Sequence, residues 1–237
     1  ELDETVRWVP ALDIDLTFHL DGFAALMVLL ISGIGVLVFA YAASYFPPQA
    51  PRLGRLIGLL ALFSGSMVGV VLADNVIVLY GFWELTSITS FLLIGNDHDD
   101  PRARGAALQA LLVTGAGGLA LLGGFLILGH EAGTFELSAI LADPPGGSAA
   151  VIAALVLVLL GAFTKSAQAP FHGWLPGAMV APTPVSAYLH SATMVKAGVY
   201  LVARLSPAFA VLDMWRPVVV TVGVVTMLVG GLRALRQ

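Results

Sequence analysis

Residues 161–204 read GAFTKSAQAPFHGWLPGAMVAPTPVSAYLHSATMVKAGVYLVAR, and the architecture of the chain can be predicted from this segment outwards. It is strongly apolar, yet between Pro170 and Pro184 four prolines and two glycines interrupt the pattern. A proline inside a helix removes an amide donor and costs ~3 kcal/mol. Broken backbone at membrane depth persists only where protein or a water-filled cavity satisfies its polar groups. The stretch is either a plain loop between two spans or a re-entrant half-helix, and the mostly apolar segment 174–180 favours the half-helix.

The composition of the whole chain is that of a membrane protein. Of its 237 residues 58% are hydrophobic and 11% are charged, and the mean hydropathy is +0.93. A soluble domain carries roughly 25% charged residues. The net charge of −4 and the lack of a basic stripe give no sign of nucleic-acid binding. Without cysteine, this chain can supply no disulfide, thiolate nucleophile or iron–sulfur ligand.

Continuous apolar runs of about 20 residues predict transmembrane helices, because barrel strands would alternate over about ten residues. We expect an all-α membrane protein with about seven spans, one of them interrupted. Residues 1–21 are expected to form an acidic, irregular segment. The spans are expected at about 22–46, 56–73, 76–95, 104–129, 149–168, 185–204 and 214–233, with the break at about 169–184.

The arginines in the connections predict the orientation. With residue 1 outside, the inside connections hold six arginines, namely Arg52, Arg55, Arg102, Arg104, Arg233 and Arg236. The outside connections then hold three, namely Arg7, Arg204 and Arg216. Because cytoplasmic loops are enriched in Lys and Arg, an outside N-terminal residue is favoured.

Three charged residues fall inside apolar runs. They are the two lysines of the chain, Lys165 and Lys196, and the acid Glu84. A charge at the centre of a bilayer costs at least ~2.5–3.5 kcal/mol on insertion scales, so such residues are usually functional. Because their signs are mixed, a path for protons or cations is predicted.

Glu84 lies about ten residues from either end of its span, too deep for its carboxylate to reach the headgroups. Ser87 and Ser90 follow at three-residue steps and are expected to line the same stripe of the helix. Glu84 is therefore expected either to change its protonation as a cation approaches or to form a static interhelical pair.

Lys165 comes just before the break. A buried lysine can become a proton carrier, whereas one near a helix end can also extend towards the headgroups. Because Ser166, Gln168 and broken backbone follow directly, we expect Lys165 to lie in a polar cavity.

His190 and Lys196 share one span. Six helical residues separate them by ~240° around the axis and ~9 Å along it. Thr193 lies three residues from each, so its hydroxyl could bridge them or hold a water. His190 could instead be a packed hydrogen bonder. His172, in the break, could gate access from the inside or cap a half-helix.

Several kinds of enzyme site are excluded by the motifs. The sequence contains no HExxH, no GxSxG and no glycine-rich phosphate loop with a lysine. Gly115, Gly117 and Gly118 resemble a nucleotide-binding fingerprint, but in an apolar span they favour close helix packing instead.

Three segments resemble the MrpA-type subunit of multisubunit cation/proton antiporters, which is related to the antiporter-like subunits of respiratory complex I. They are ADNVIVLYGFWELTSITSFLLIG (73–95), TKSAQAPFHGWLPGAMVAPTPVSAYLHSATMVKAGVYLVAR (164–204) and the terminal LRALRQ (232–237). The resemblance implies that Glu84 is the acid of the family's fifth span. It implies that Lys165 is the central proton carrier before the break of the seventh, and that His190 and Lys196 are the polar pair of the eighth. Complex I homologues commonly have threonine at the position of Lys196 and tend to have aspartate at that of Gly118, so the antiporter is favoured.

The resemblance also implies the organisation of the chain. Residues 1–21 would be an outside segment, 22–55 a first span with its inside connection, and 56–204 the first of two inverted five-helix repeats. Residues 205–237 would begin the second repeat, the rest of which is expected to follow Gln237. Two further spans are expected before residue 1. The chain would then hold one half-channel.

The function expected from the residues and the resemblance is proton transfer in a multisubunit Na⁺/H⁺ antiporter of a bacterial cell membrane. Glu84 would pair with Lys165, which would then release the pair and pass a proton towards His190 and Lys196. The partners expected are the other antiporter subunits, Na⁺, H⁺ and lipid, with no cofactor or metal. The two alternatives are a proton-pumping subunit of NADH:quinone oxidoreductase and a non-transporting scaffold subunit.

Overall fold

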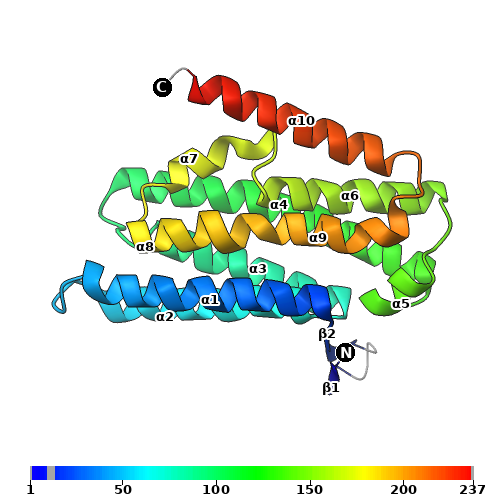
Figure 1. Ribbon diagram of the computed structural model, residues 1–237, viewed down its shortest axis with the longest axis horizontal. Helices are drawn as coiled ribbons and strands as arrows, with labels where there is room; N and C mark the ends of the chain where they lie inside the picture. The colour runs from blue at the N-terminus through cyan, green and yellow to red at the C-terminus, as the bar shows by residue number, and fades with distance from the viewer. Residues whose placement is uncertain (1, 10–13, 236–237) are drawn as a thin grey trace.

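The computed structural model describes residues 2–9 and 14–235, and the chain folds into a bundle of helices with a small hairpin at one end (Figure 1). The long helices are α1 Gly22–Tyr45, α2 Leu53–Leu72, α3 Val76–Ile94, α4 Pro101–Ala132, α6 Ala149–Lys165, α9 Met194–Phe209 and α10 Trp215–Ala234. Figure 1 shows them running along one common direction, with α10 at the edge of the bundle. The short helices are α5 Leu137–Ala142, α7 Trp174–Ala178 and α8 Thr183–Ser186.

Five helices of the described chain are long and apolar enough to cross a membrane, namely α1, α2, α3, α4 and α10. They correspond to five of the seven expected spans. The other two are assembled from shorter pieces. Helix α6 has 17 residues and ends at Lys165, before the expected residue 168. The expected span 185–204 consists of the end of α8, a π-helical segment Ala187–Thr193 and the first part of α9.

The interruption predicted after Lys165 is present. Ala167 has a left-handed conformation with φ 50°, and Pro170 follows a cis peptide bond. Since a left-handed residue cannot continue an α-helix and a proline offers no amide donor, α6 ends here. A single 3₁₀ turn, Phe171–Gly173, leads into α7, whose five residues make little more than one helical turn. The half-helix expected at 174–180 is therefore only this short helix.

The N-terminal segment differs from the irregular one expected. Strand β1 (Leu2–Val9) pairs in antiparallel fashion with β2 (Ile14–Leu20). The register sets Val6 opposite Leu16 and Leu2 opposite Leu20, so the alternation of apolar and polar residues fits a two-residue period. This alternation was readable in the sequence. A bridge from Phe18 to Ala73 ties the hairpin to the turn between α2 and α3.

Glycines bring α4 and α6 into close contact. A Cβ on Gly124 would lie 2.6 Å from the carbonyl oxygen of Ala154, and one on Gly161 would lie 2.8 Å from that of Gly117. A Cβ on Gly117 would overlap the hydroxyl of Thr164. The expected close packing is thus met at Gly117 and at Gly118, where a Cβ would overlap Glu84 of α3, but not at Gly115, where a Cβ would meet no atom within 4 Å.

The two ends of the bundle are fixed by polar contacts. At one end Arg52 donates to the carbonyl of Asn96 and, at 3.4 Å, to the carboxylate of Asp99, so the connections after α1 and after α3 meet. At the other end Arg204 of α9 pairs with Asp21, whose side chain caps α1. The connections assigned to a common side by the arginine pattern therefore lie together. Arg236 falls outside the described residues.

Candidate ion-translocation site

Lys165 is the last residue of α6, and its side chain is completely buried. Figure 1 shows that α6 ends about midway along the bundle. Its Nζ donates hydrogen bonds to the backbone carbonyl of Trp83 at 2.9 Å and to the hydroxyl of Ser87 at 2.6 Å. Nζ also lies 5.1 Å from the centroid of the Trp83 ring. The alternative in which Lys165 extends to the headgroups does not fit this position.

Glu84 is partly buried between α3 and α4. Its Oε1 has no hydrogen-bond partner among the described residues, and a Cβ on Gly118 of α4 would overlap it. The two groups that bind Lys165, the Trp83 carbonyl and the Ser87 hydroxyl, lie within one turn of Glu84 on α3. No ion pair within 4.0 Å joins the Glu84 carboxylate to the Lys165 ammonium group in the described structure. Lys165 is thus held by Trp83 and Ser87 and not by the carboxylate of Glu84.

His190 lies in the π-helical segment and is 7% exposed. Its ring meets that of Trp174 edge to face, with 6.0 Å between the centroids. Neither ring nitrogen has a hydrogen-bond partner among the described residues. The imidazole borders a cavity of about 370 Å³, whose other walls include Thr183, Ser186 and Met179. His190 is therefore a buried titratable group next to space that can hold water.

Thr193 and Lys196 face different surroundings. Thr193 is fully buried, and its hydroxyl donates to the carbonyl of Tyr188 at 2.6 Å. No described contact joins Thr193 to His190 or Lys196, because the π-helical turn directs the hydroxyl back along its own helix. Lys196 is exposed on the surface of α9, directly beside the buried Val195 and Ala197. The two lysines therefore differ in burial although both interrupt apolar runs.

His172 lies in the 3₁₀ turn between α6 and α7, and its side chain is partly buried. Both ring nitrogens are shielded from solvent and without a hydrogen-bond partner in the described chain. The imidazole therefore does not cap a described helix through a hydrogen bond.

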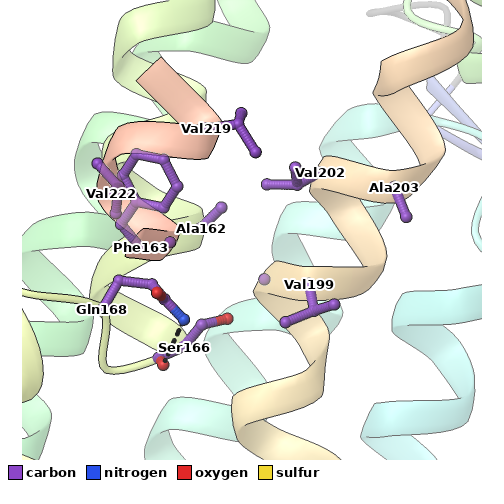
Figure 2. Close-up of a pocket in the computed structure, with 11 residues that line it drawn as sticks. Ala162, Phe163, Ser166, Gln168, Val199, Val202, Ala203, Val219 and Val222 are labelled. Carbon is purple, nitrogen blue, oxygen red and sulfur yellow. Dashed lines mark hydrogen bonds between the residues drawn. The ribbon is translucent and has the colours of Figure 1, made fainter. Parts of the chain in front are cut away.

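A second cavity, of about 240 Å³, lies beside the break, between α6, α9 and α10 (Figure 2). Val199, Val202, Val219 and Val222 line it, and Figure 2 shows Ser166 and Gln168 together at one side. Ser166 donates to the carbonyl of Val195 at 2.7 Å, which ties the end of α6 to α9. The amide of Ala169 donates to Thr226 of α10. One backbone amide of the break is thus bonded to α10, and the Ser166 side chain bonds to α9.

Two tryptophans, Trp83 and Trp174, belong to the site although the sequence did not lead us to expect them there. Trp83 supplies a carbonyl and an aromatic face to Lys165, and Trp174 donates its indole N–H to the carbonyl of Thr164 at 3.0 Å. Their positions in the sequence could have indicated them, since Trp83 directly precedes Glu84 and Trp174 lies within the break. Among the described residues no three His, Asp or Glu side chains gather closely enough to hold a metal ion.

Comparisons with known proteins agree with this architecture. Residues 73–237 match the family model described as NADH:quinone oxidoreductase/Mrp antiporter, transmembrane, and residues 8–55 match the N-terminal model of complex I chain 5. The chain is 50% identical over its full length to the A subunit of the Na⁺/H⁺ antiporter of Alkalihalophilus pseudofirmus, and covers 30% of that protein. It is 52% identical to the A/B subunit of a probable K⁺/H⁺ antiporter of Rhizobium meliloti, over 98% of its own length and 23% of that protein.

A solved structure is similar as well. The Mrp complex from Dietzia sp. DQ12-45-1b contains a chain that is 45% identical to this one and superimposes with a TM-score of 0.85. The match covers 90% of this chain and 24% of that chain. This chain therefore spans about a quarter to a third of the relatives it matches. The matches and the apolar helices together show an integral membrane protein that belongs to the NADH:quinone oxidoreductase/Mrp antiporter family.

Proposed function

We propose that this chain forms the proton-carrying part of one subunit in a multisubunit Na⁺/H⁺ antiporter. The observation that carries the proposal is the Lys165 ammonium group, which is fully buried and bonded to Trp83 and Ser87 of α3, the helix that carries Glu84. Burying such a group costs free energy, so a chain that retains one usually uses it. The names of the relatives, which are subunits of Na⁺/H⁺ or K⁺/H⁺ antiporters, support the same assignment.

In the proposed mechanism Lys165 alternates between two positions. In the described position it is bonded to Trp83 and Ser87. In the other it would pair directly with Glu84, and release from that pair would favour transfer of a proton. The protonation states of the two groups are coupled, because the charge on either changes the energy of the other.

The proton would next move towards His190 and Lys196, with His172 in the break as a gate. Supporting this route, Glu84, His172 and His190 all carry shielded polar atoms without a partner in the described chain. Such atoms in an apolar interior call for water, and waters can relay protons. Thr193 would act by shaping the π-helical segment, since its hydroxyl is bonded to Tyr188.

Lys196 would be the last carrier on this chain. Its exposed position on α9 fits transfer to a group outside residues 1–237, as expected if these residues form one half-channel of a longer protein. We further propose a bacterial plasma membrane with the N-terminal hairpin outside. The arginines support this orientation, because the end of the bundle where Arg52 and Arg104 lie is the richer in arginine.

The test is Lys165→Ala in the full-length protein, assembled with its partner subunits in sealed vesicles. We expect sodium-driven proton movement to fall at least ~100-fold, because general acid–base groups commonly contribute ~10²–10⁴-fold. Retained exchange in the assembled variant would sink the proposal. Repeating the assay with potassium identifies the cation.

A complex I-type proton pump is the second candidate, because the matching family model covers both classes. Such a pump would purify with quinone and iron–sulfur chromophores, which the absorbance spectrum of the complex would reveal.

A further inference from the structure

The surroundings of Lys165 contain a feature beyond its proximity to Glu84. Its ammonium group sits over the face of the Trp83 ring, at 5.1 Å from the centroid, and the indole is fully buried. The ring of tryptophan attracts cations more strongly than those of tyrosine and phenylalanine, and the attraction is larger where water is excluded. Trp83 therefore offers Lys165 a stabilising contact that needs no counter-charge.

Two hydrogen bonds fix the same ammonium group. The Trp83 carbonyl accepts one at 2.9 Å and the Ser87 hydroxyl accepts the other at 2.6 Å. Both acceptors lie one turn apart on α3, so they and the indole face form one binding surface for the ammonium group. A lysine has three N–H donors, and this surface occupies two of them. The third remains available for Glu84 or for a proton acceptor.

Neighbouring contacts support this surface. The Trp83 carbonyl also accepts a hydrogen bond from the hydroxyl of Thr86 at 2.7 Å, and Ser87 is fully buried. On the lysine side, α6 is pressed against α4 at Gly161 and Gly117. The position of the ammonium group is therefore determined by packing on both helices.

We propose that Trp83, together with the Ser87 hydroxyl, is a positioning residue that holds the Lys165 ammonium group in its unpaired state. This proposal rests on the proposed function, because it assigns the position that Lys165 occupies when it has left Glu84. Trp83 would act through Lys165 and would not itself carry a proton.

The experiment compares Trp83→Leu with Trp83→Phe in the full-length protein within its complex, reconstituted in sealed vesicles. Both changes shorten the side chain and keep the backbone carbonyl, but only phenylalanine retains an aromatic face. We expect Trp83→Leu to lower the maximal exchange rate per assembled complex about tenfold, with the KM for sodium unchanged. Trp83→Phe should recover a large part of that rate.

The hydroxyl is tested in the same way. Ser87→Ala should lower the maximal rate, and Ser87→Thr, which keeps a hydroxyl, should restore it. A matched control is Trp215→Leu, since Trp215 at the start of α10 is also buried but bonds to Ser206 of α9. Its rate per assembled complex should stay within about twofold of the unaltered protein.

A structural role alone would reduce the amount of assembled complex and would not rank the variants by aromatic strength. Equal rates for Trp83→Leu and Trp83→Phe, or a leucine variant within about twofold of the unaltered protein, would overturn the positioning role. If Trp83→Leu does not assemble, the positioning role is judged from the exchange rates of Trp83→Phe and the two Ser87 variants. Exchange retained in Lys165→Ala overturns the proposed function itself, whereas loss in Lys165→Ala with full activity in both Trp83 variants overturns only the inference about Trp83.

Discussion

Helices α6 and α9 each carry one of the two lysines, but the chain holds them in different ways. Helix α6 packs against α4 through glycines, and its Lys165 is enclosed by α3. Helix α9 also packs closely against α6 at Gly198, and it is tied in addition by side-chain hydrogen bonds, from Tyr200 to the carbonyl of Val71 at 2.9 Å and from Arg204 to Asp21. Its Lys196 is left exposed. Lys165 is therefore bound by polar groups of this chain, whereas the surroundings of Lys196 depend on what covers α9.

The largest expected difference between the two lysines is in the reactivity of their amines. In the detergent-solubilised chain 1–237, an amine-reactive reagent should modify Lys196 at least ~100-fold faster than Lys165, because a buried amine reacts only after local opening that costs ~3 kcal/mol. Peptide mapping by mass spectrometry measures both rates. Protection of Lys196 in the full-length protein would show that a further segment covers this face. Equal rates in the chain itself would contradict the enclosure of Lys165.

A second prediction concerns the packing that encloses Lys165. Gly124→Ala should destabilise the chain by about 1–3 kcal/mol, because the new methyl group would overlap backbone and side-chain atoms of α6. A Cβ there would lie 2.8 Å from Val158 Cγ2 as well as 2.6 Å from the Ala154 oxygen. Unfolding of the detergent-solubilised protein by denaturant measures the change.

Gly123→Ala is the matched control, since its Cβ would meet only Leu157 Cδ1 at 3.8 Å. This variant should be neutral or slightly stabilised, because alanine favours a helix over glycine by up to ~1 kcal/mol. Equal effects of the two alanines would show that α4 and α6 are not in close contact.

The smallest expected effect concerns the Arg204–Asp21 contact, which connects α9 to the start of α1. Burial alone would raise the pKa of Asp21, but the amide of Ala24 and the guanidinium of Arg204 outweigh it and hold this pKa below its ordinary value. The stabilisation is therefore fully present above the unfolded pKa of ~3.9 and is lost as the pH falls through the lower, folded value. Asp21→Ala should cost ~1 kcal/mol at neutral pH through loss of the helix cap.

Asp21→Asn separates the two contributions, because asparagine can cap a helix but carries no charge. Denaturant unfolding at neutral and acidic pH should show that Asp21→Asn removes the pH dependence of this site and keeps most of the cap. A variant with unchanged acid sensitivity would show that Arg204 and Asp21 are not paired in solution.

Much of the fold could be predicted from hydrophobicity and proline. The approximate positions of the spans followed from apolar runs, and the break followed from the prolines that begin with Pro170, because these signals are local. The hairpin was missed, since its two-residue alternation is short and lies among charged residues. The π-helical segment was missed because no local signal distinguishes it from an α-helix.

Candidate members of the site could be proposed from the sequence, but their contacts could not. Glu84, Lys165, His190 and Lys196 were singled out because ionisable groups are rare inside apolar runs, and their roles stay predictions. The direct pairing of Glu84 with Lys165 was an inference from charge and depth. The bonds of Lys165 to Trp83 and Ser87 depend instead on how α6 rotates against α3, which no spacing within one helix can reveal.

Hydrophobicity and backbone chemistry are properties of short segments, so the sequence was enough to predict a chain that belongs in a bilayer, a break after Lys165, and which charged residues interrupt apolar runs. The packing of whole helices was needed to show that Lys165 is enclosed while Lys196 is exposed. Both lysines interrupt similar apolar runs, and the direction in which each side chain points is set by the packing of whole helices against one another.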